Sequence, residues 1–249
     1  MQAVEIFRIF VIVYDQAQSS GVNLMRIIGA ANLIGLALFF LTPGLVLAAG
    51  PEIGTIVTAR QAAASPGAGV ALDVMKNVPV RKGEKLITGP FGRMNITFID
   101  DSEISIGPEA NITLDDLVYS PHRSMANQFQ VSVVSGAFRY LSGKIAKLNG
   151  PMVSLKTPLA TIGIRGTHVL AIVDENYAGC IVLLPTPGAE DKPSSITVTA
   201  NGKSVTIDKP GWGTEVTGAN TPPTAPRTWP RDRIMKMLQM SGSSAEFLK

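Results

Sequence analysis

Apolar and polar residues alternate in short runs from about residue 50 onward. Met94, Ile96 and Phe98 alternate with Asn95 and Thr97, which is the two-residue period of a strand that buries one face. Similar runs follow about every 8 to 10 residues, between Gly, Pro, Asn and Asp residues. This spacing is too short for a strand with a crossover helix, so successive strands must turn straight back or coil into stacked rungs.

The same period predicts further strands at 104–106, 112–114, 129–134, 136–141, 152–155, 160–164, 169–173, 180–184, 196–200, 204–207 and 213–216. We therefore predict one all-β domain of many short strands over residues 50–217. This number of strands fits a sandwich, a barrel or a β-solenoid, and periodicity alone does not choose among them, because it does not say which strands pair.

Two segments interrupt the alternation. Residues 117–127 have no alternating pattern and contain Pro121, which predicts a surface loop. Residues 218–230 are rich in proline and predict a stiff, extended linker. After this linker, residues 231–249 predict a short amphipathic helix and a tail, with Ile234, Met237 and Leu238 on one face. Such a helix either packs back on the domain or docks on a partner.

Residues 1–49 have the order of a secretory signal peptide. Met25 and Arg26 precede an apolar segment, and small residues follow the breaker Pro43-Gly44. Cleavage is expected after Ala48 or Ala49, and Met25 is the hypothetical true start. The alternative is an uncleaved anchor at 27–47, because these 21 uncharged residues can cross roughly 30 Å of hydrocarbon.

The composition of the chain excludes several classes of protein and of site. A mean hydropathy of +0.23 with 16% charged residues argues against disorder. The net charge of +3 is scattered along the chain, which is too weak a signal for nucleic-acid binding. The single cysteine, Cys180, excludes an intramolecular disulfide and a thiolate metal cluster within one chain.

Two motifs carry a family resemblance. The first is Gly83-Glu-Lys-Leu-Ile-Thr-Gly89 followed by Asn95 to Ile106, and the second is Thr157-Pro158-Leu-Ala160-Thr-Ile-Gly163-Ile-Arg165-Gly166-Thr167. Together they resemble FecR-domain proteins, over residues 70–173 and more weakly to 216. The chain departs from the family pattern at Asp100-Asp101, where the family has Asp-Gly, so that turn would have to be reshaped.

The resemblance implies an all-β domain outside the inner membrane, with a β-solenoid or roll-like architecture. The regulators that name the family also have a cytoplasmic region that holds a sigma factor, a transmembrane helix and a C-terminal domain that meets an outer-membrane transporter. Residues 1–24 are too few and too apolar for a sigma-binding domain, and beyond residue 216 only the predicted linker and helix follow. The chain therefore resembles shorter exported members, for which binding or scaffolding is the expected role.

The second motif invites a phosphate-loop interpretation, but it lacks the glycine spacing and the Lys-Ser/Thr pair of such loops. We expect instead a tight turn between strands, in which glycine supplies unusual φ values or close approach. Arg165 would then pair with a carboxylate, cap carbonyl groups, or anchor a partner on the surface.

Five carboxylates could be neighbours in adjacent strands: Asp100, Asp101, Glu103, Asp115 and Asp116. A calcium site and a carboxylate pair for glycoside chemistry are alternatives. We favour solvated turn residues that form an acidic surface, because no EF-hand spacing or Asp-Gly repeat is present.

The remaining candidates are weak. A zinc site would need both His122 and His168 brought together with carboxylates; His168 is expected to be a structural or edge residue, and Cys180 a small buried apolar residue. The sequence has no Gly-x-Ser-x-Gly elbow, so we expect no enzyme, metal or cofactor.

We therefore predict an exported, periplasmic or secreted FecR-like binding or scaffold module that contacts envelope proteins. Its expected contact with the membrane is through the signal peptide or anchor alone. One alternative is an inner-membrane sensor tethered by residues 27–47. Another is a protein that binds or acts on carbohydrate or peptidoglycan.

Overall fold

The structure is a computed structural model that describes residues 50–66, 72–120, 127–148, 153–174, 177–184 and 194–243. The chain divides into two compact units, Met1–Ala48 and Ala49–Lys249. The predicted signal peptide, its cleavage site and the anchor alternative lie outside the described residues. Within them, no helix is both long and apolar enough to cross a membrane.

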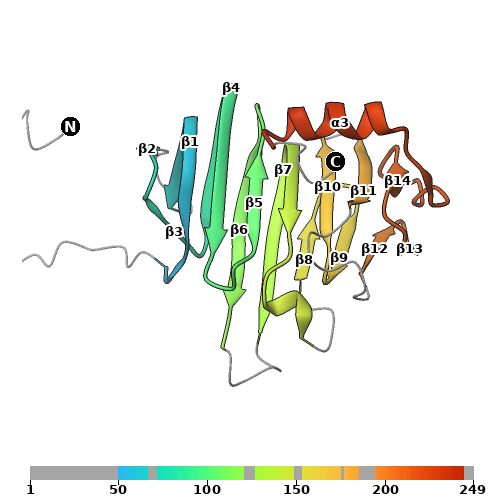
Figure 1. Ribbon diagram of the computed structural model, residues 1–249, viewed down its shortest axis with the longest axis horizontal. Helices are drawn as coiled ribbons and strands as arrows, with labels where there is room; N and C mark the ends of the chain where they lie inside the picture. The colour runs from blue at the N-terminus through green and yellow to red at the C-terminus, as the bar shows by residue number, and fades with distance from the viewer. Residues whose placement is uncertain are drawn as a thin grey trace, which may run out of the picture. The chain divides into compact units, whose positions relative to one another are not determined.

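The second unit is built almost entirely of strands, as predicted (Figure 1). In chain order these are β1 (Glu52–Pro66), β2 (Leu72–Asp73), β3 (Pro79–Arg81), β4 (Glu84–Phe98), β5 (Glu103–Ile106), β6 (Asn111–Val118), β7 (Gln128–Leu141), β8 (Val153–Lys156), β9 (Thr161–Arg165), β10 (His168–Val173), β11 (Ala178–Leu184), β12 (Ser195–Ala200), β13 (Lys203–Ile207), β14 (Trp212–Val216) and β15 (Arg227–Thr228). A 3₁₀ turn, η3 (Ile145–Lys147), precedes β8, and the helix α3 (Arg231–Met240) follows β15.

Strand β7 bends and belongs to two layers of sheet. The rings of Phe129 and Tyr140 lie 5.8 Å apart, centroid to centroid, although an extended strand would separate these positions by about 36 Å at roughly 3.3 Å per residue. The strand turns at Gly136, whose φ is +112°, and a Cβ there would overlap Ala110. Phe98 of β4 completes the contact, with its ring 4.8 Å from that of Phe129.

The two halves of β7 pair with different neighbours. Residues 128–135 pair with β6 on one side and with β8 on the other, and the sheet continues through β9 and β12 to β13. Residues 136–141 pair with β5 and β10, and that sheet continues through β11 and β14 to β15. The alternate residues of both layers bury one continuous hydrophobic core between them.

The pairing decides the architecture that periodicity left open. Among the described strands every pair is antiparallel except β7 with β8. The all-β prediction is confirmed. The strands turn straight back instead of stacking in parallel rungs, so the structure is roll-like and a β-solenoid is not confirmed.

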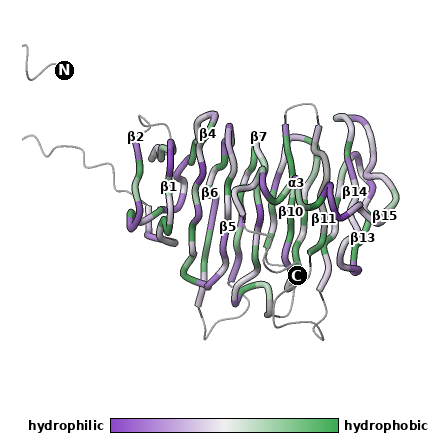
Figure 2. The backbone as a smooth tube through the Cα atoms, turned by 45° about the horizontal axis from the view of Figure 1, so that its top comes forward, coloured by the Kyte–Doolittle hydropathy of each residue, from purple (hydrophilic) through white to green (hydrophobic). Residues whose placement is uncertain are grey.

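Helix α3 occupies the predicted residues 231–240 and packs against the outer face of β10 and β11. Ile234, Met237 and Leu238 are buried with Leu170 and Leu184 in a second, smaller apolar cluster. Figures 1 and 2 show the helix beside these strands. The two faces of β10 therefore serve two cores, because its alternate side chains point to the main core and to the helix. The helix packs back on the domain, which was one of its two expected roles.

Residues 218–230 lie against the sheet and do not form the extended linker that was predicted. Arg227 and Thr228 pair with β14 as β15, the Trp229 amide donates to the Gly211 carbonyl at 2.9 Å, and the Thr224 amide donates to the Glu215 carbonyl at 2.9 Å. The prolines permit this because they lie at positions where no ladder hydrogen bond is required.

Candidate functional site

The second family motif begins with a tight turn. The Thr157 amide donates to the Ala160 carbonyl at 2.8 Å, and the Ala160 amide donates back to Thr157 Oγ1 at 2.9 Å. Pro158 follows Thr157 in the turn, where its fixed φ suits the second turn position. These contacts start β9 at a defined residue.

Gly163 corrects the expectation of a glycine turn. It lies in the middle of β9, paired with Ser154 and Thr197, and its φ is not in the left-handed region. A Cβ added there would meet only the Thr197 carbonyl oxygen, at an ordinary 3.8 Å. The interpretation of Gly163 as a turn residue is therefore wrong, and the fold does not require a glycine at this position.

The turn that does need glycine is at Gly166, whose φ is +57°. It carries the chain from β9 in one layer to β10 in the other. Thr167 is buried beside it and fixes the crossing, since its amide donates to Ser142 Oγ at 2.9 Å and its carbonyl accepts from the Ser142 amide at 3.0 Å. Arg165, just before the turn, is exposed on the outer face of β9, where it forms no ion pair with another described residue.

Asp100 is not the solvated turn residue that was expected. It is fully buried and accepts from the Ser102 amide at 3.1 Å, from Ser102 Oγ at 2.5 Å and from the Ile145 amide at 3.3 Å. A Cβ on Gly143 would overlap the Asp100 carbonyl. Asp100 therefore fastens the β4–β5 turn to η3, and its role is structural.

Asp101 occupies the position where the resemblance has glycine, and it keeps the glycine conformation with a φ of +62°. Its carboxylate pairs with Lys144 Nζ at 2.6 Å. The hydrogen bond to Asp101 raises the pKa of Lys144 above its ordinary value. The turn is therefore retained with aspartate in a strained backbone region rather than reshaped.

The other three acids have separate partners. Glu103 pairs with Arg139 at 3.5 Å, where burial lowers the pKa of Arg139 and the Glu103 charge acts against that effect. Asp115 accepts from Ser132 Oγ at 2.7 Å, and Asp116 pairs with Lys82 at 2.8 Å and accepts from Gln128 at 2.8 Å. The five carboxylates are thus dispersed, and no group of three metal-ligating side chains forms among the described residues.

The histidines are not brought together by the described residues. His168 is buried at the start of β10, as expected for a structural residue, while His122 lies outside the described residues. Cys180 is part of β11, but its side chain is outside the described set, so its predicted burial stays a prediction.

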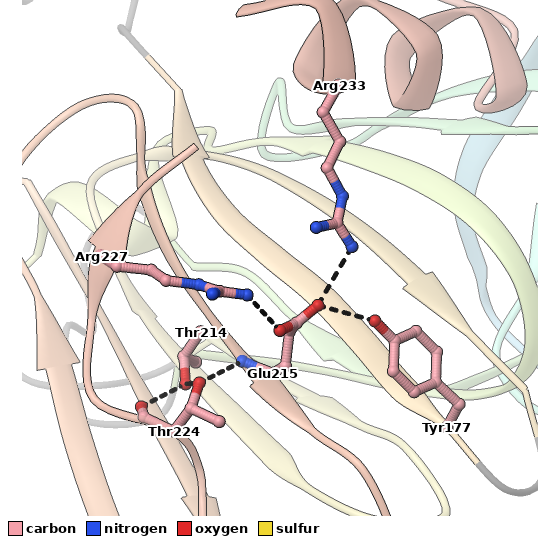
Figure 3. Close-up of polar contacts among 6 residues, drawn as sticks. All are labelled: Tyr177, Thr214, Glu215, Thr224, Arg227 and Arg233. Carbon is pink, nitrogen blue, oxygen red and sulfur yellow. Dashed lines mark hydrogen bonds and ion pairs between the residues drawn. The ribbon is translucent and has the colours of Figure 1, made fainter. Parts of the chain in front are cut away.

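A carboxylate at the C-terminal end of the domain was missed by sequence reasoning. Glu215 of β14 accepts from Tyr177 Oη at 2.8 Å, from Arg227 at 2.5 Å and from Arg233 of α3 at 3.1 Å (Figure 3). The guanidinium of Arg233 also lies over the Trp229 ring at 3.9 Å. We call Tyr177, Glu215, Arg227 and Arg233 the Glu215 latch, because it joins the start of β11, β14, β15 and α3.

Backbone contacts reinforce the latch. The Glu215 amide donates to Thr224 Oγ1 at 3.0 Å, and Thr214 Oγ1 donates to the Thr224 carbonyl at 2.6 Å (Figure 3). The Glu215 side chain is only 12% exposed. No sequence spacing links Glu215 to its partners, which come from three separate elements.

The largest exposed apolar side chains gather at the opposite end of the strand order. Leu72, Met75 and Phe91 are 65%, 75% and 72% exposed. Met75 follows Val74, whose amide donates to the Ala62 carbonyl at 3.0 Å. Phe91 lies between Gly89 and Gly92, where an added Cβ would meet Gln61. Met75 and Phe91 thus lie along the two edges of β1, near residues 61 and 62. We call these three residues the apolar cluster.

The model of the FecR protein family matches residues 84–184. The chain contains a FecR domain. The match begins at the first residue of β4 and ends at the last residue of β11. The FecR domain therefore includes the first motif from Glu84 onward, the whole second motif and the two-layered β7, while β1–β3 on one side and β12–β15 on the other extend its sheets.

Among solved structures, the chain is similar to two crystal structures of a putative anti-sigma factor from Parabacteroides distasonis ATCC 8503, at 2.50 and 1.65 Å resolution. In both cases the identity is 9%, the TM-score is 0.46, and the alignment covers 62% of this chain and 64% of that chain. The chain thus spans less than two thirds of the protein it resembles. No curated protein matches the chain.

Proposed function

We propose that this protein is an exported binding module of the bacterial cell envelope, that it takes part in envelope signalling, and that it acts through protein–protein contact rather than catalysis. The FecR domain at residues 84–184 supports a signalling role. The apolar cluster is the observation that supports a contact surface, because Met75 and Phe91 in it are about three quarters exposed.

Physical chemistry supports a protein as the partner at this cluster. Single exposed apolar residues are common on soluble proteins and need no explanation. Here two large side chains lie along the two edges of β1, near residues 61 and 62, and aromatic residues and methionine are the types enriched in the centres of protein interfaces. Covering them would remove apolar surface from water, which is the main driving force of association.

Site-specific photo-cross-linking tests the contact. Replacing Phe91 with p-benzoylphenylalanine in the full chain, in a bacterium that exports it, should give a discrete cross-linked product with an envelope protein. The same replacement at the exposed, polar Gln239 of α3 is the matched control and should give none. Absence of a product at residue 91, or equal products at both positions, would contradict the proposal.

A double variant separates binding from folding. Met75→Ser with Phe91→Ser changes only exposed side chains, so the free energy of unfolding should move by less than about 1 kcal/mol. The partner cross-linked at residue 91 should no longer co-purify with this variant. Retention of that partner by a folded double variant would exclude the apolar cluster as the contact.

The exported location is tested separately by intact mass. A soluble periplasmic species that begins at Ala49 or Gly50 is the expected product. A membrane-bound species that retains residues 27–47 would overturn this part of the proposal and favour the tethered sensor.

A further inference from the structure

The outer face of the β8–β9–β12–β13 sheet is a regular array of polar side chains. Ser154, Gly163, Thr197 and Thr206 lie opposite one another in one row across the four strands, and Lys156, Thr161, Thr199 and Ser204 form the next row. Hydroxyl pairs join the last two strands, at 3.3 Å between Thr197 and Thr206 and at 2.8 Å between Thr199 and Ser204. We call these eight residues and Arg165 the polar face.

Gly163 at the centre of this face is not explained by the fold. Its backbone is compatible with any residue, and an added Cβ would make only an ordinary contact at 3.8 Å. Glycine within a strand costs stability and packs nothing, and it often marks a point where a ligand approaches the backbone closely. The missing side chain leaves open space between Ser154 and Thr197, directly above the sheet.

The nine residues of the polar face carry only positive charge. Lys156 and Arg165 are exposed, and no ion pair holds either of them among the described residues. The two rows contain no carboxylate, and the row of Arg165 runs through Ser195 to the exposed Asp208, two strands away. Rows next to each other on one face of a strand are about 6.6 Å apart, so the two cations lie about 13 Å apart along the strands. A ligand that matches them carries single, well-separated negative charges.

These features favour a sugar polymer over a protein surface. Interface centres between proteins are enriched in aromatic residues and depleted in serine and lysine, and this face has no large apolar side chain. A flat array of hydroxyl groups can exchange hydrogen bonds with sugar hydroxyls, and a guanidinium binds a planar carboxylate through two parallel hydrogen bonds. We propose that the polar face binds an acidic polysaccharide whose sugars carry carboxylate groups.

Affinity electrophoresis of the full chain tests this proposal independently of any protein partner. In native gels at low salt, polygalacturonate in the matrix should retard the protein, while neutral dextran and a phosphate polymer, polyphosphate, should not. The variant with Lys156→Gln and Arg165→Gln should bind polygalacturonate about tenfold more weakly, since it loses two exposed charge pairs. Lys236→Gln removes an equally exposed cation on α3 and should change the affinity less than twofold.

A glycine variant tests the shape of the face without changing charge. Gly163→Val should keep the fold, because the space above residue 163 is open. Its melting temperature should fall by no more than a few degrees. Its branched side chain should weaken binding of polygalacturonate by about tenfold or more. Gly218→Val is the matched control, because Gly218 lies outside the polar face and an added Cβ there meets nothing closer than Thr221 at 3.9 Å; this variant should bind like the wild type.

The proposal fails if polygalacturonate does not retard the wild-type protein, or if polyphosphate or dextran retards it equally. It also fails if folded Gly163→Val and the double cation variant bind like the wild type. A result of this kind would leave the protein contact at the apolar cluster standing, because that contact lies on other strands and is measured by cross-linking.

Discussion

Glu215→Ala should destabilise the domain more than the loss of an ordinary surface charge. Three donors converge on this carboxylate, which is only 12% exposed. The bond from Tyr177, at 2.8 Å, is a hydrogen bond to a charged group and contributes about 1.5–3 kcal/mol. The side chains of Arg227 and Arg233 are 57% and 44% exposed. Solvent screening therefore reduces the contribution of each ion pair to about 0.5 kcal/mol.

The sum is therefore about 2.5–4 kcal/mol. For a domain of this size, 1 kcal/mol shifts the melting temperature by about 2–4 °C, so Glu215→Ala should melt about 5–16 °C lower than the wild type in far-UV circular dichroism. Limited proteolysis should also cut the segment after residue 217 earlier than in the wild type, because the latch no longer holds β15 and α3 on the sheet.

Glu52→Ala is the matched control. Glu52 pairs with Arg81 at 2.6 Å but is 61% exposed, and an exposed pair of this kind contributes about 0–1 kcal/mol. Its melting temperature should fall by no more than about 3 °C. If Glu215→Ala and Glu52→Ala melt together, the reasoning that assigns the C-terminal segment to the latch is refuted.

The structure also predicts the stability of three further variants. Asp100→Ala leaves the amides of Ser102 and Ile145 without their acceptor and should lower the free energy of unfolding in urea by about 3 kcal/mol, whereas a fall below 1 kcal/mol would contradict the role of Asp100. Gly166→Ala should cost about 1–2 kcal/mol in the same assay because its φ is +57°. Burial, and then the Asp100 charge, raise the pKa of Tyr140 far above its ordinary value; the unfolded chain therefore loses this proton near pH 10 while the folded chain keeps it, and stability should fall as pH rises above 10. Tyr140→Phe should flatten that fall, and an unchanged slope would exclude Tyr140 as its source.

Much of the fold could be predicted from sequence because alternation records which side of a strand is buried. Ile234, Met237 and Leu238 likewise predicted α3 and its buried face. Pairing could not be predicted in this way, because the same two-residue period suits a solenoid rung and an antiparallel strand. The bend of β7 at Gly136 depends on what packs around it, and nothing in the local pattern distinguishes it from a loop.

The site residues were harder to place. Gly163 and Gly166 look alike in a motif, and only the backbone separates a strand glycine from a turn glycine. Asp100 was expected to be solvated because acids at turns usually are, yet three donors allow its burial. The Glu215 latch has no sequence signature, since its partners are brought together only when β11, β14 and α3 are already in place.

The sharing of β7 between both layers has a consequence for how the protein assembles. This strand pairs with β5, β6, β8 and β10, so neither layer can be completed before residues on both sides of it in the chain are available. A nascent chain stopped after β7 would expose two unfinished edges, which are sites of aggregation. Passage across a membrane in an unfolded state, followed by folding only after the last strands arrive, would avoid that hazard.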